Sequence, residues 1–107
     1  MQQYNDLIKQ IKIKFCNEKL LKNAFTHKSY VNEHRNENIE DNERLEFLGD
    51  AVLELAATKH LFEKYPNQSE GDMTAFRSAL VKGKHLAEVS EELKLGNICF
   101  WATVRKN

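Results

Sequence analysis

The sequence predicts an all-α fold. Apolar residues recur at intervals of three and four, which is the period of an amphipathic helix, and the alternation typical of strands is nearly absent. Helix breakers are scarce, because the 107 residues include one proline and four glycines. The length suits one domain with a modest core and is too short for two. We therefore expect about five helices in a single domain covering residues 1–107.

Two helices are expected in the N-terminal third. The first runs from about Tyr4 to Lys14 and places its apolar side chains on one side. Asn17 is typical of an N-cap, because its side-chain oxygen can accept a hydrogen bond from a backbone N–H of the first turn. It would begin a second helix. Residues 27–41 (HKSYVNEHRNENIED) are polar and irregular, so a loop is expected there.

A long helix is expected next. Either Asp41 or Asn42 caps its N-terminus, since both side chains favour that position. The helix ends at the KYP sequence, because the residue before Pro66 disfavours the α conformation.

Two further helices complete the predicted fold. Ser69 is followed three residues later by Asp72, which resembles a weakened capping box, and the helix that it begins runs to about Lys82. A last helix covers roughly 84–94. Gly96 is expected to close it, as glycine commonly does after a helix.

The composition excludes membrane and secretory classes. Apolar residues make up 41% and charged residues 30% of the chain, and the longest apolar runs fall far short of the roughly 20 residues that span a bilayer. The N-terminus lacks the basic-then-apolar pattern of a secretory signal. A cytoplasmic protein with no membrane association is expected. Cys16 and Cys99 are expected to be small buried thiols rather than a disulfide, and they give no metal-site signal.

Charge is unevenly distributed along a chain whose net charge is zero. Residues 1–32 carry +4, residues 33–54 carry −6 and residues 55–107 carry +2. Solvated helix faces and chance account for such a pattern. The alternative is a cation site flanked by surfaces that tolerate a polyanion.

A stripe of acids marks the predicted long helix, which begins NERLEFLGD. Glu43, Glu46, Asp50 and Glu54 are spaced i, i+3, i+7 and i+11, so they share one side of the helix. The helix is otherwise apolar nearly all round, which is the pattern of a buried helix. Like charges in such a helix are costly unless a partner neutralises them.

A divalent cation is one such partner. Ligands that are all carboxylate oxygens suit Mg²⁺ or Mn²⁺, and no His or Cys stands at a spacing that would suggest zinc. For Glu46 and Asp50, which lie in the most apolar stretch, we favour the metal. For Glu54 we favour exposure or an ion pair with a base from another helix, and this alternative also stays open for Glu43.

Gly49 is a second anomaly in the same helix. A glycine inside a helix costs about 1 kcal/mol relative to alanine. Close approach of another backbone or of a partner helix is the simplest reason for its presence.

Three elements of the sequence then resemble a known family. NERLEFLGDAVLEL resembles the signature of the ribonuclease III endonuclease domain. LLKNAFTHKSYVNE is similar to the upstream element of that family, and EGDMTAFRSALVKGKHLAEVSEELKLG is similar to the downstream element. Together they cover nearly all of residues 5–96 in the order of the family.

The resemblance implies an all-α homodimer that cleaves double-stranded RNA by Mg²⁺-dependent phosphodiester hydrolysis, leaving 5′-phosphate and 3′-hydroxyl ends. Recognition would rest on duplex shape and on phosphate and 2′-hydroxyl contacts rather than base identity. Glu46 and Asp50 match the metal-binding acids of the family. Glu43 and Glu70 match acidic positions near the cleft.

The resemblance also assigns roles to neighbouring residues. Phe47 matches the aromatic residue that docks into the second subunit, and Gly49 matches the glycine where helices approach. Four positions match residues with structural or site-supporting roles: Asn42, His27, Ser29 and Arg77.

The chain departs from the family at its C-terminal end. After the element that matches residues 93–96, the family continues into a helix with a second acidic pair, and a double-stranded-RNA-binding domain often follows. Here the chain reads GNICFWATVRKN, so we expect a truncated endonuclease domain with impaired activity. Glu88 and Glu91 are expected to be solvated, and Phe100 and Trp101 to cap the core. The alternatives are a catalytically silent module for RNA binding or dimerisation, and a helical scaffold whose acids form salt bridges.

Overall fold

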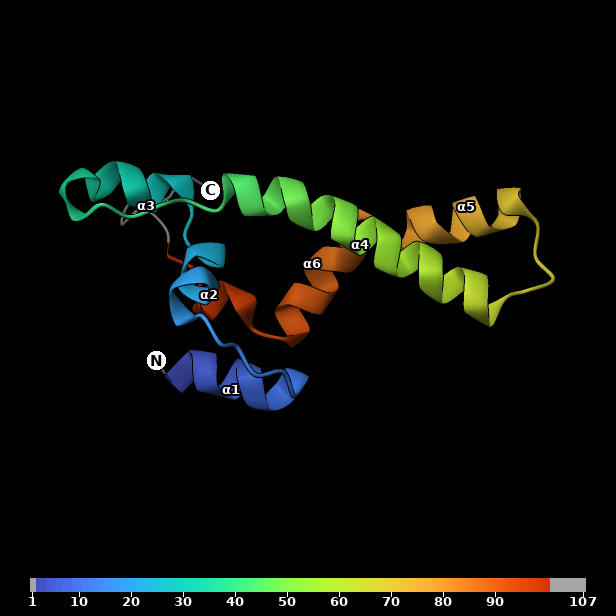
Figure 1. The fold of residues 1–107 in the computed structure, drawn as a ribbon, viewed down its shortest axis with the longest axis horizontal. Helices are drawn as coiled ribbons and strands as arrows, with labels where there is room; N and C mark the ends of the chain where they lie inside the picture. The colour runs from blue at the N-terminus through green and yellow to red at the C-terminus, as the bar shows by residue number, and fades with distance from the viewer. Residues whose placement is uncertain (1, 101–107) are drawn as a thin grey trace.

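The computed structural model describes residues 2–100, and within them the fold is all-α, as predicted (Figure 1). Six α helices and two short 3₁₀ helices follow one another in these residues: α1 (Gln2–Ile11), α2 (Glu18–Ala24), α3 (Lys28–Glu33), η1 (Arg35–Glu37), α4 (Glu43–Lys64), α5 (Glu70–Leu80), α6 (Gly83–Glu92) and η2 (Leu95–Asn97). None of these helices is long and apolar enough to cross a membrane.

Both ends of the described chain meet in one hydrophobic core. Tyr4 and Leu7 of α1 pack with Leu21 of α2 and with Ile98, which follows η2, and all four side chains are buried. Phe100 packs against this cluster, as predicted. Trp101, for which the same role was predicted, lies outside the described residues.

A short backbone pairing fastens the C-terminal segment to the core. The N–H of Phe100 donates to the carbonyl of Phe25 at 2.7 Å, and the N–H of His27 donates to the carbonyl of Phe100 at 2.9 Å. Thr26, between them, is fully buried, and its hydroxyl donates to the carbonyl of Lys22 at 2.8 Å. Because this polar side chain has a partner, its burial carries little cost.

The loop predicted for residues 27–41 is wrong over residues 28–37, most of which form α3 and η1. The His27 ring accepts a hydrogen bond from the N–H of Ser29 at 3.1 Å and thereby caps α3. The rings of Tyr30 and His34 stack with centroids 4.0 Å apart. These contacts stabilise a helix in a polar sequence that has no helical periodicity.

Helices α4 and α5 form an antiparallel arm that extends from the core (Figure 1). Helix α4 follows Asn42 and ends at Lys64, the first residue of the KYP sequence, as predicted. The N–H of Asp72 donates to the Ser69 hydroxyl at 3.1 Å, so the predicted cap of α5 is confirmed. Ala57 and Leu61 of α4 are buried along this arm.

Two predicted helix ends are wrong. Helix α1 ends at Ile11 rather than near Lys14, because Lys12 takes a left-handed conformation (φ 58°). Helix α6 ends at Glu92, and Lys94 rather than Gly96 takes the left-handed conformation (φ 56°). Gly96 instead lies within η2.

Two predictions of burial are also wrong for the isolated chain. Helix α4 was predicted to be buried, yet Leu55 and Phe62 are each 70% exposed and Phe47 is 83% exposed. Cys16 is exposed and Cys99 is partly buried, and neither forms a disulfide within the described residues. An apolar pattern predicts which surface needs covering, and here much of that cover does not come from residues 2–100.

The overall dimensions agree with this open arrangement. The Cα radius of gyration is 16.6 Å, whereas a compact chain of this length has about 13 Å. The accessible surface is 9050 Å², against roughly 6,200 Å² for a folded monomer of 12.5 kDa. The chain therefore exposes far more surface than a self-sufficient domain of its size.

Candidate active site on helix α4

The N-terminus of α4 is tied to the core by Asn42. Its backbone N–H donates to the carbonyl of Thr26 at 3.0 Å, and its side-chain amide donates to the carbonyl of Ala24 at 2.8 Å. Asn42 occupies the cap position but makes no capping bond through its side chain. Asn42 therefore holds the first turn of α4 against the end of α2, and its site-supporting role stays a prediction.

A second asparagine fixes the segment that leads into α4. The side-chain amide of Asn23 donates to the carbonyls of Glu40 and Asp41, at 2.8 and 2.7 Å. Asn23 was not predicted from the sequence, because its acceptors are backbone carbonyls 17 and 18 positions away and no local pattern marks them. The two asparagines together set where the acid stripe begins.

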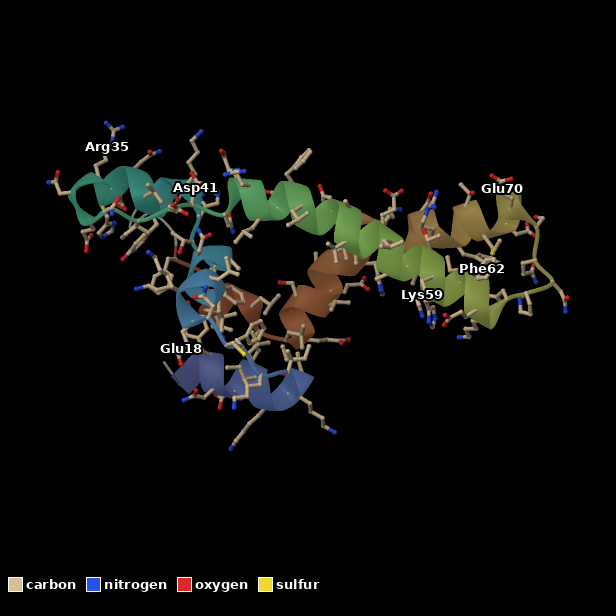
Figure 2. The ribbon with its side chains drawn as sticks, viewed as in Figure 1. Glu18, Arg35, Asp41, Lys59, Phe62 and Glu70 are labelled. Carbon is tan, nitrogen blue, oxygen red and sulfur yellow. The ribbon has the colours of Figure 1, made fainter. Side chains whose placement is uncertain are left out.

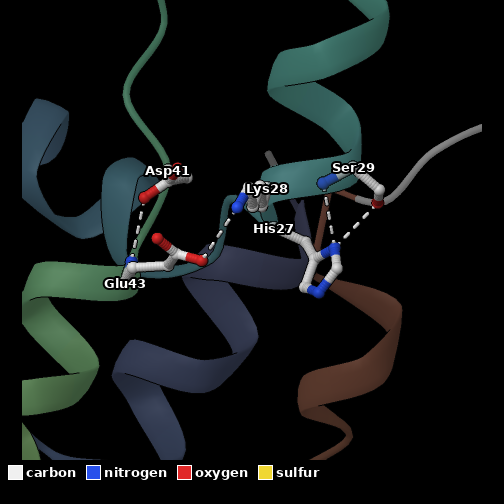
Figure 3. A network of polar contacts seen from close by, with 5 residues as sticks. All are labelled: His27, Lys28, Ser29, Asp41 and Glu43. Atoms are coloured by element: carbon white, nitrogen blue, oxygen red, sulfur yellow. Dashed lines mark hydrogen bonds and ion pairs between the residues drawn. The ribbon is translucent and has the colours of Figure 1, made fainter.

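Glu43 opens the stripe and is held in two ways (Figure 3). The Asp41 carboxylate accepts a hydrogen bond from its backbone N–H at 3.0 Å, so the capping predicted for Asp41 or Asn42 comes from Asp41. The Glu43 carboxylate lies 3.6 Å from the Lys28 ammonium, and both side chains are largely exposed. An exposed pair of this kind contributes about 0–1 kcal/mol, so it can rearrange easily.

Beside this pair, His27 and Ser29 form a local network (Figure 3). The Ser29 hydroxyl lies 2.7 Å from Nδ1 of His27, which also accepts the Ser29 N–H. Since Nδ1 accepts, the neutral ring carries its proton on Nε2. The two residues shape the start of α3, which agrees with the structural role that the resemblance implies.

Glu46 and Asp50 lie one helical turn apart in the middle of the stripe, and both are exposed. Within residues 2–100, neither carboxylate takes part in an ion pair or a side-chain hydrogen bond. They differ in this respect from the acids at the two ends of the stripe. Two adjacent carboxylates without a basic partner concentrate negative charge at one place on the helix.

Glu54, the last acid of the stripe, forms an ion pair with a base from another helix, as predicted. Its carboxylate lies 3.7 Å from Nε of Arg77 on α5. Arg77 also donates a hydrogen bond to the Thr58 hydroxyl at 3.0 Å. Arg77 thus links α5 to α4, which is a structural role.

Glu70 lies away from the acid pair in this chain. It sits in the first turn of α5, beside the end of α4 that carries Phe62, whereas Asp41 lies at the opposite end (Figure 2). A cavity of about 230 Å³ separates the two helices there, and its lining includes Glu70, Phe62 and Arg77. The role near the cleft that the resemblance implies for Glu70 stays a prediction.

The acid pair fits a divalent cation of the Mg²⁺ type. Mg²⁺ binds through one or two carboxylates and keeps several waters, so two exposed carboxylates one turn apart supply a suitable partial donor set. Among the residues that the structure describes, no group of three or more His, Cys, Asp or Glu side chains is placed to hold a metal ion. The pair would therefore hold a cation with help from water or from groups outside these residues.

Phe47 and Gly49 lie on different sides of α4. Residues two positions apart are separated by about 200° round a helix, so one straight partner helix cannot contact both. A side chain added at Gly49 would meet nothing within 4 Å among the residues that the structure describes. These residues therefore give no reason for the glycine, and its role in a dimer stays a prediction.

The arrangement of helices is that of a known class of nuclease domain. Two solved structures of the nuclease domain of ribonuclease III from Campylobacter jejuni superpose on it with TM-scores of 0.82 and 0.80, at 37% and 38% identity. The matches cover 96% and 92% of this chain, and 66% and 64% of the solved chains. The second structure is described as showing flexibility in a region involved in dimer formation.

The sequence comparison leads to the same class. Residues 17–107 match the model of the Ribonuclease-III-like family, and the chain belongs to that family. Ribonuclease 3 of Bacillus velezensis is 53% identical over 98 residues, which are 92% of this chain and 39% of that protein. Ribonuclease 3 of Listeria monocytogenes is 56% identical over 91 residues, or 85% and 40%. The chain thus spans about two fifths of the length of these relatives.

Proposed function

We propose that this chain supplies the metal-binding helix of a divalent-metal-dependent endoribonuclease that cleaves double-stranded RNA. The main support for this proposal is that the acids of the stripe differ in whether they pair with a base. Glu43 and Glu54 pair with bases from other helices, whereas Glu46 and Asp50 project from the same helix with no such partner in the described residues. Relatives named Ribonuclease 3 support the choice of RNA hydrolysis.

The role of each residue follows from its position. Glu46 and Asp50 would hold Mg²⁺, or Mn²⁺ in its place, and the bound ion would activate the attacking water and stabilise the leaving oxygen. Asn42 keeps the helix start fixed against the core. Lys28 holds Glu43 at the edge of the site. Because the pair is exposed and weak, Glu43 can turn toward a bound ligand.

The proposed reaction is hydrolysis of one phosphodiester in each strand. The oxygen of a water molecule forms a bond to phosphorus, the bond from phosphorus to the 3′-oxygen breaks, and that oxygen takes up a proton. The products carry 5′-phosphate and 3′-hydroxyl ends. A homodimer would present one acid pair to each strand, and Phe47 would dock into the second subunit. We place this RNA-processing activity in the cytoplasm.

A catalytically silent module for RNA binding or dimerisation is the alternative function. The observation that favours it is the size of the cluster: only two unpaired acids come together on α4, and no third ligand from residues 2–100 joins them. Such a module would keep the family fold and bind duplex RNA without cutting it.

Titration of the purified chain with Mn²⁺ and Mg²⁺ by calorimetry tests the site. We expect Glu46→Gln and Asp50→Asn each to weaken metal binding at least tenfold, because each removes a charged ligand from a site with few ligands. Glu54→Gln is the matched control and should leave binding unchanged, since Arg77 already pairs with that acid. If neither test variant changes the affinity, the assignment is wrong.

Incubation with end-labelled duplex RNA, with and without Mg²⁺, separates the two functions. The nuclease predicts metal-dependent cuts in both strands that are lost in Glu46→Gln. The silent module predicts a shifted RNA band in a native gel with no cleavage at any enzyme concentration.

A further inference from the structure

Lys28 is the base that lies beside the N-terminal end of the acid stripe (Figure 3). Its ammonium is 3.6 Å from the Glu43 carboxylate, and Glu43 and Glu46 lie three positions apart on one side of α4. Side chains at this spacing are neighbours on a helix surface. The ammonium of Lys28 therefore lies within about one helical turn of the acid pair formed by Glu46 and Asp50.

The backbone on either side of Lys28 is fixed, whereas its side chain can turn at little cost. The N–H of His27 donates to the carbonyl of Phe100 at 2.9 Å, and the N–H of Ser29 donates to the His27 ring at 3.1 Å. The Lys28 side chain is 59% exposed, and the Glu43 carboxylate with which it pairs is equally exposed. Solvent screens such a pair, so little free energy is lost when it breaks.

Arg77, the base at the other end of the stripe, is held more firmly. It pairs with Glu54 at 3.7 Å, donates a hydrogen bond to the Thr58 hydroxyl at 3.0 Å and is only 33% exposed. Movement of Arg77 would break both contacts and loosen α5 from α4. Of the two bases that the structure places beside the stripe, Lys28 is therefore the one that can change its partner.

A strand of RNA that reaches the acid pair meets a local excess of negative charge. Residues 33–54 carry −6, and one divalent cation offsets only part of it. Each phosphate of the RNA adds a further negative charge, so a cationic side chain within reach of that phosphate lowers the repulsion. An ammonium donates to phosphate oxygens as well as to carboxylates. The position and freedom of Lys28 allow it to exchange one acceptor for the other.

We propose that Lys28 is a substrate-binding residue, whose ammonium leaves Glu43 and pairs with a phosphate oxygen of the bound RNA. This inference rests on the proposed function, because it takes duplex RNA as the ligand of the acid site. The exchange replaces one ion pair by another and compensates the phosphate charge at the edge of the site. It also releases the Glu43 carboxylate, which can then turn toward a cation held by Glu46.

RNA binding over a series of salt concentrations tests the proposal. Fluorescence anisotropy of a labelled RNA duplex measures the affinity in Ca²⁺, which also binds carboxylates, and a denaturing gel checks that the RNA stays intact. Lys28→Gln should weaken binding about three- to tenfold at about 0.1 M salt and lower the slope of log affinity against log salt by about one, because one phosphate contact is lost. Lys28→Arg keeps the charge and should restore most of the affinity and of the slope.

A double-mutant cycle tests the exchange itself. Glu43→Gln should strengthen RNA binding about twofold or more, since Lys28 then has no pair to break. In the Lys28→Gln chain the same replacement should have a smaller effect, because no exchange remains. Lys59→Gln is the matched control: Lys59 pairs with Glu63 at 2.6 Å and lies about 140–180° round α4 from the acids of the stripe. It should change neither the affinity nor the slope.

Circular dichroism of each variant should match that of the parent chain, because the replaced side chains are exposed. If the parent chain binds the duplex and Lys28→Gln binds it with the same affinity and salt slope, the role of Lys28 is wrong and the proposed function is unaffected. Equal effects of Glu43→Gln in both backgrounds would overturn the exchange. If the parent chain binds no duplex RNA, the proposed function and this inference are both wrong.

Discussion

At the residue scale, four carboxylates on one side of α4 have two different environments. Glu43 and Glu54 face bases 3.6 and 3.7 Å away, while Glu46 and Asp50 have no partner in the described chain. Spacing alone predicted the shared stripe, because helical geometry is local. It could not predict Lys28 as the partner of Glu43, since the two residues lie 15 positions apart and meet only in the folded chain.

Tyr4 is the residue whose titration should be visible in the stability of the fold. Burial raises the pKa of the Tyr4 hydroxyl above its usual value of 10, with a further contribution from Cys99. A raised pKa means that the folded chain keeps this proton while the unfolded chain loses it. The contribution of this proton to the free energy of unfolding is therefore complete below about pH 10. It is lost as the pH rises through the pKa that Tyr4 has in the folded chain.

Replacing Tyr4 by phenylalanine should remove this alkaline loss. The Tyr4 hydroxyl is buried and has no hydrogen-bond partner among residues 2–100, so Tyr4→Phe should be neutral or slightly stabilising at pH 7. Urea denaturation at pH 7 and above pH 10 measures both effects. A parent chain that loses no more stability than the variant at high pH would contradict the prediction.

At the element scale, the sequence predicted helices whose signals are local. The α4 start, the KYP stop and the Ser69 cap are set by residues within a few positions of the helix ends. Helix α3 was missed because it depends on a histidine cap and on the stacking of Tyr30 with His34. The end of α6 was misplaced because a lysine, rather than the expected glycine, took the left-handed conformation.

The pairing of α4 with α5 depends on a residue that can be tested. Arg77 bonds to Thr58 and pairs with Glu54, and its side chain is only 33% exposed. Arg77→Ala should lower the free energy of unfolding by about 1–2 kcal/mol. Lys59→Ala is the control, because it breaks a more exposed pair within α4 and should cost about 0.5 kcal/mol or less. If urea denaturation shows that the two variants lose the same free energy of unfolding, Arg77 has no special role in pairing α4 with α5.

At the scale of the whole molecule, the extended shape explains why the predicted burial of α4 failed. The pattern predicted a helix that is buried nearly all round, whereas the described residues cover α4 mainly along α5. A single sequence carries no information on which other polypeptide supplies the rest. The candidate site is limited in the same way, since residues 2–100 bring together one acid pair and no third ligand.

Measurement of the oligomeric state tests whether a second copy of the chain covers part of α4. We expect the chain to form dimers, and Phe47→Ala to shift them toward monomers, because Phe47 is 83% exposed and large enough to anchor an interface. Sedimentation velocity over a concentration series measures the shift. Ile13→Ala, which removes another exposed apolar side chain away from α4, should leave the profile unchanged. An unchanged profile for Phe47→Ala would count against the assigned interface.

The core described above joins α1 to Ile98 and Phe100, and this has a consequence for synthesis on the ribosome. Leu21 of α2 follows α1 closely on the chain, whereas Ile98 emerges about 91 residues after Leu7, which takes roughly 5–20 seconds at about 5–20 residues per second. During those seconds Tyr4 and Leu7 have only the part of their native cover that α2 provides. The contact between α1 and Ile98 therefore forms later than the contact between α1 and α2.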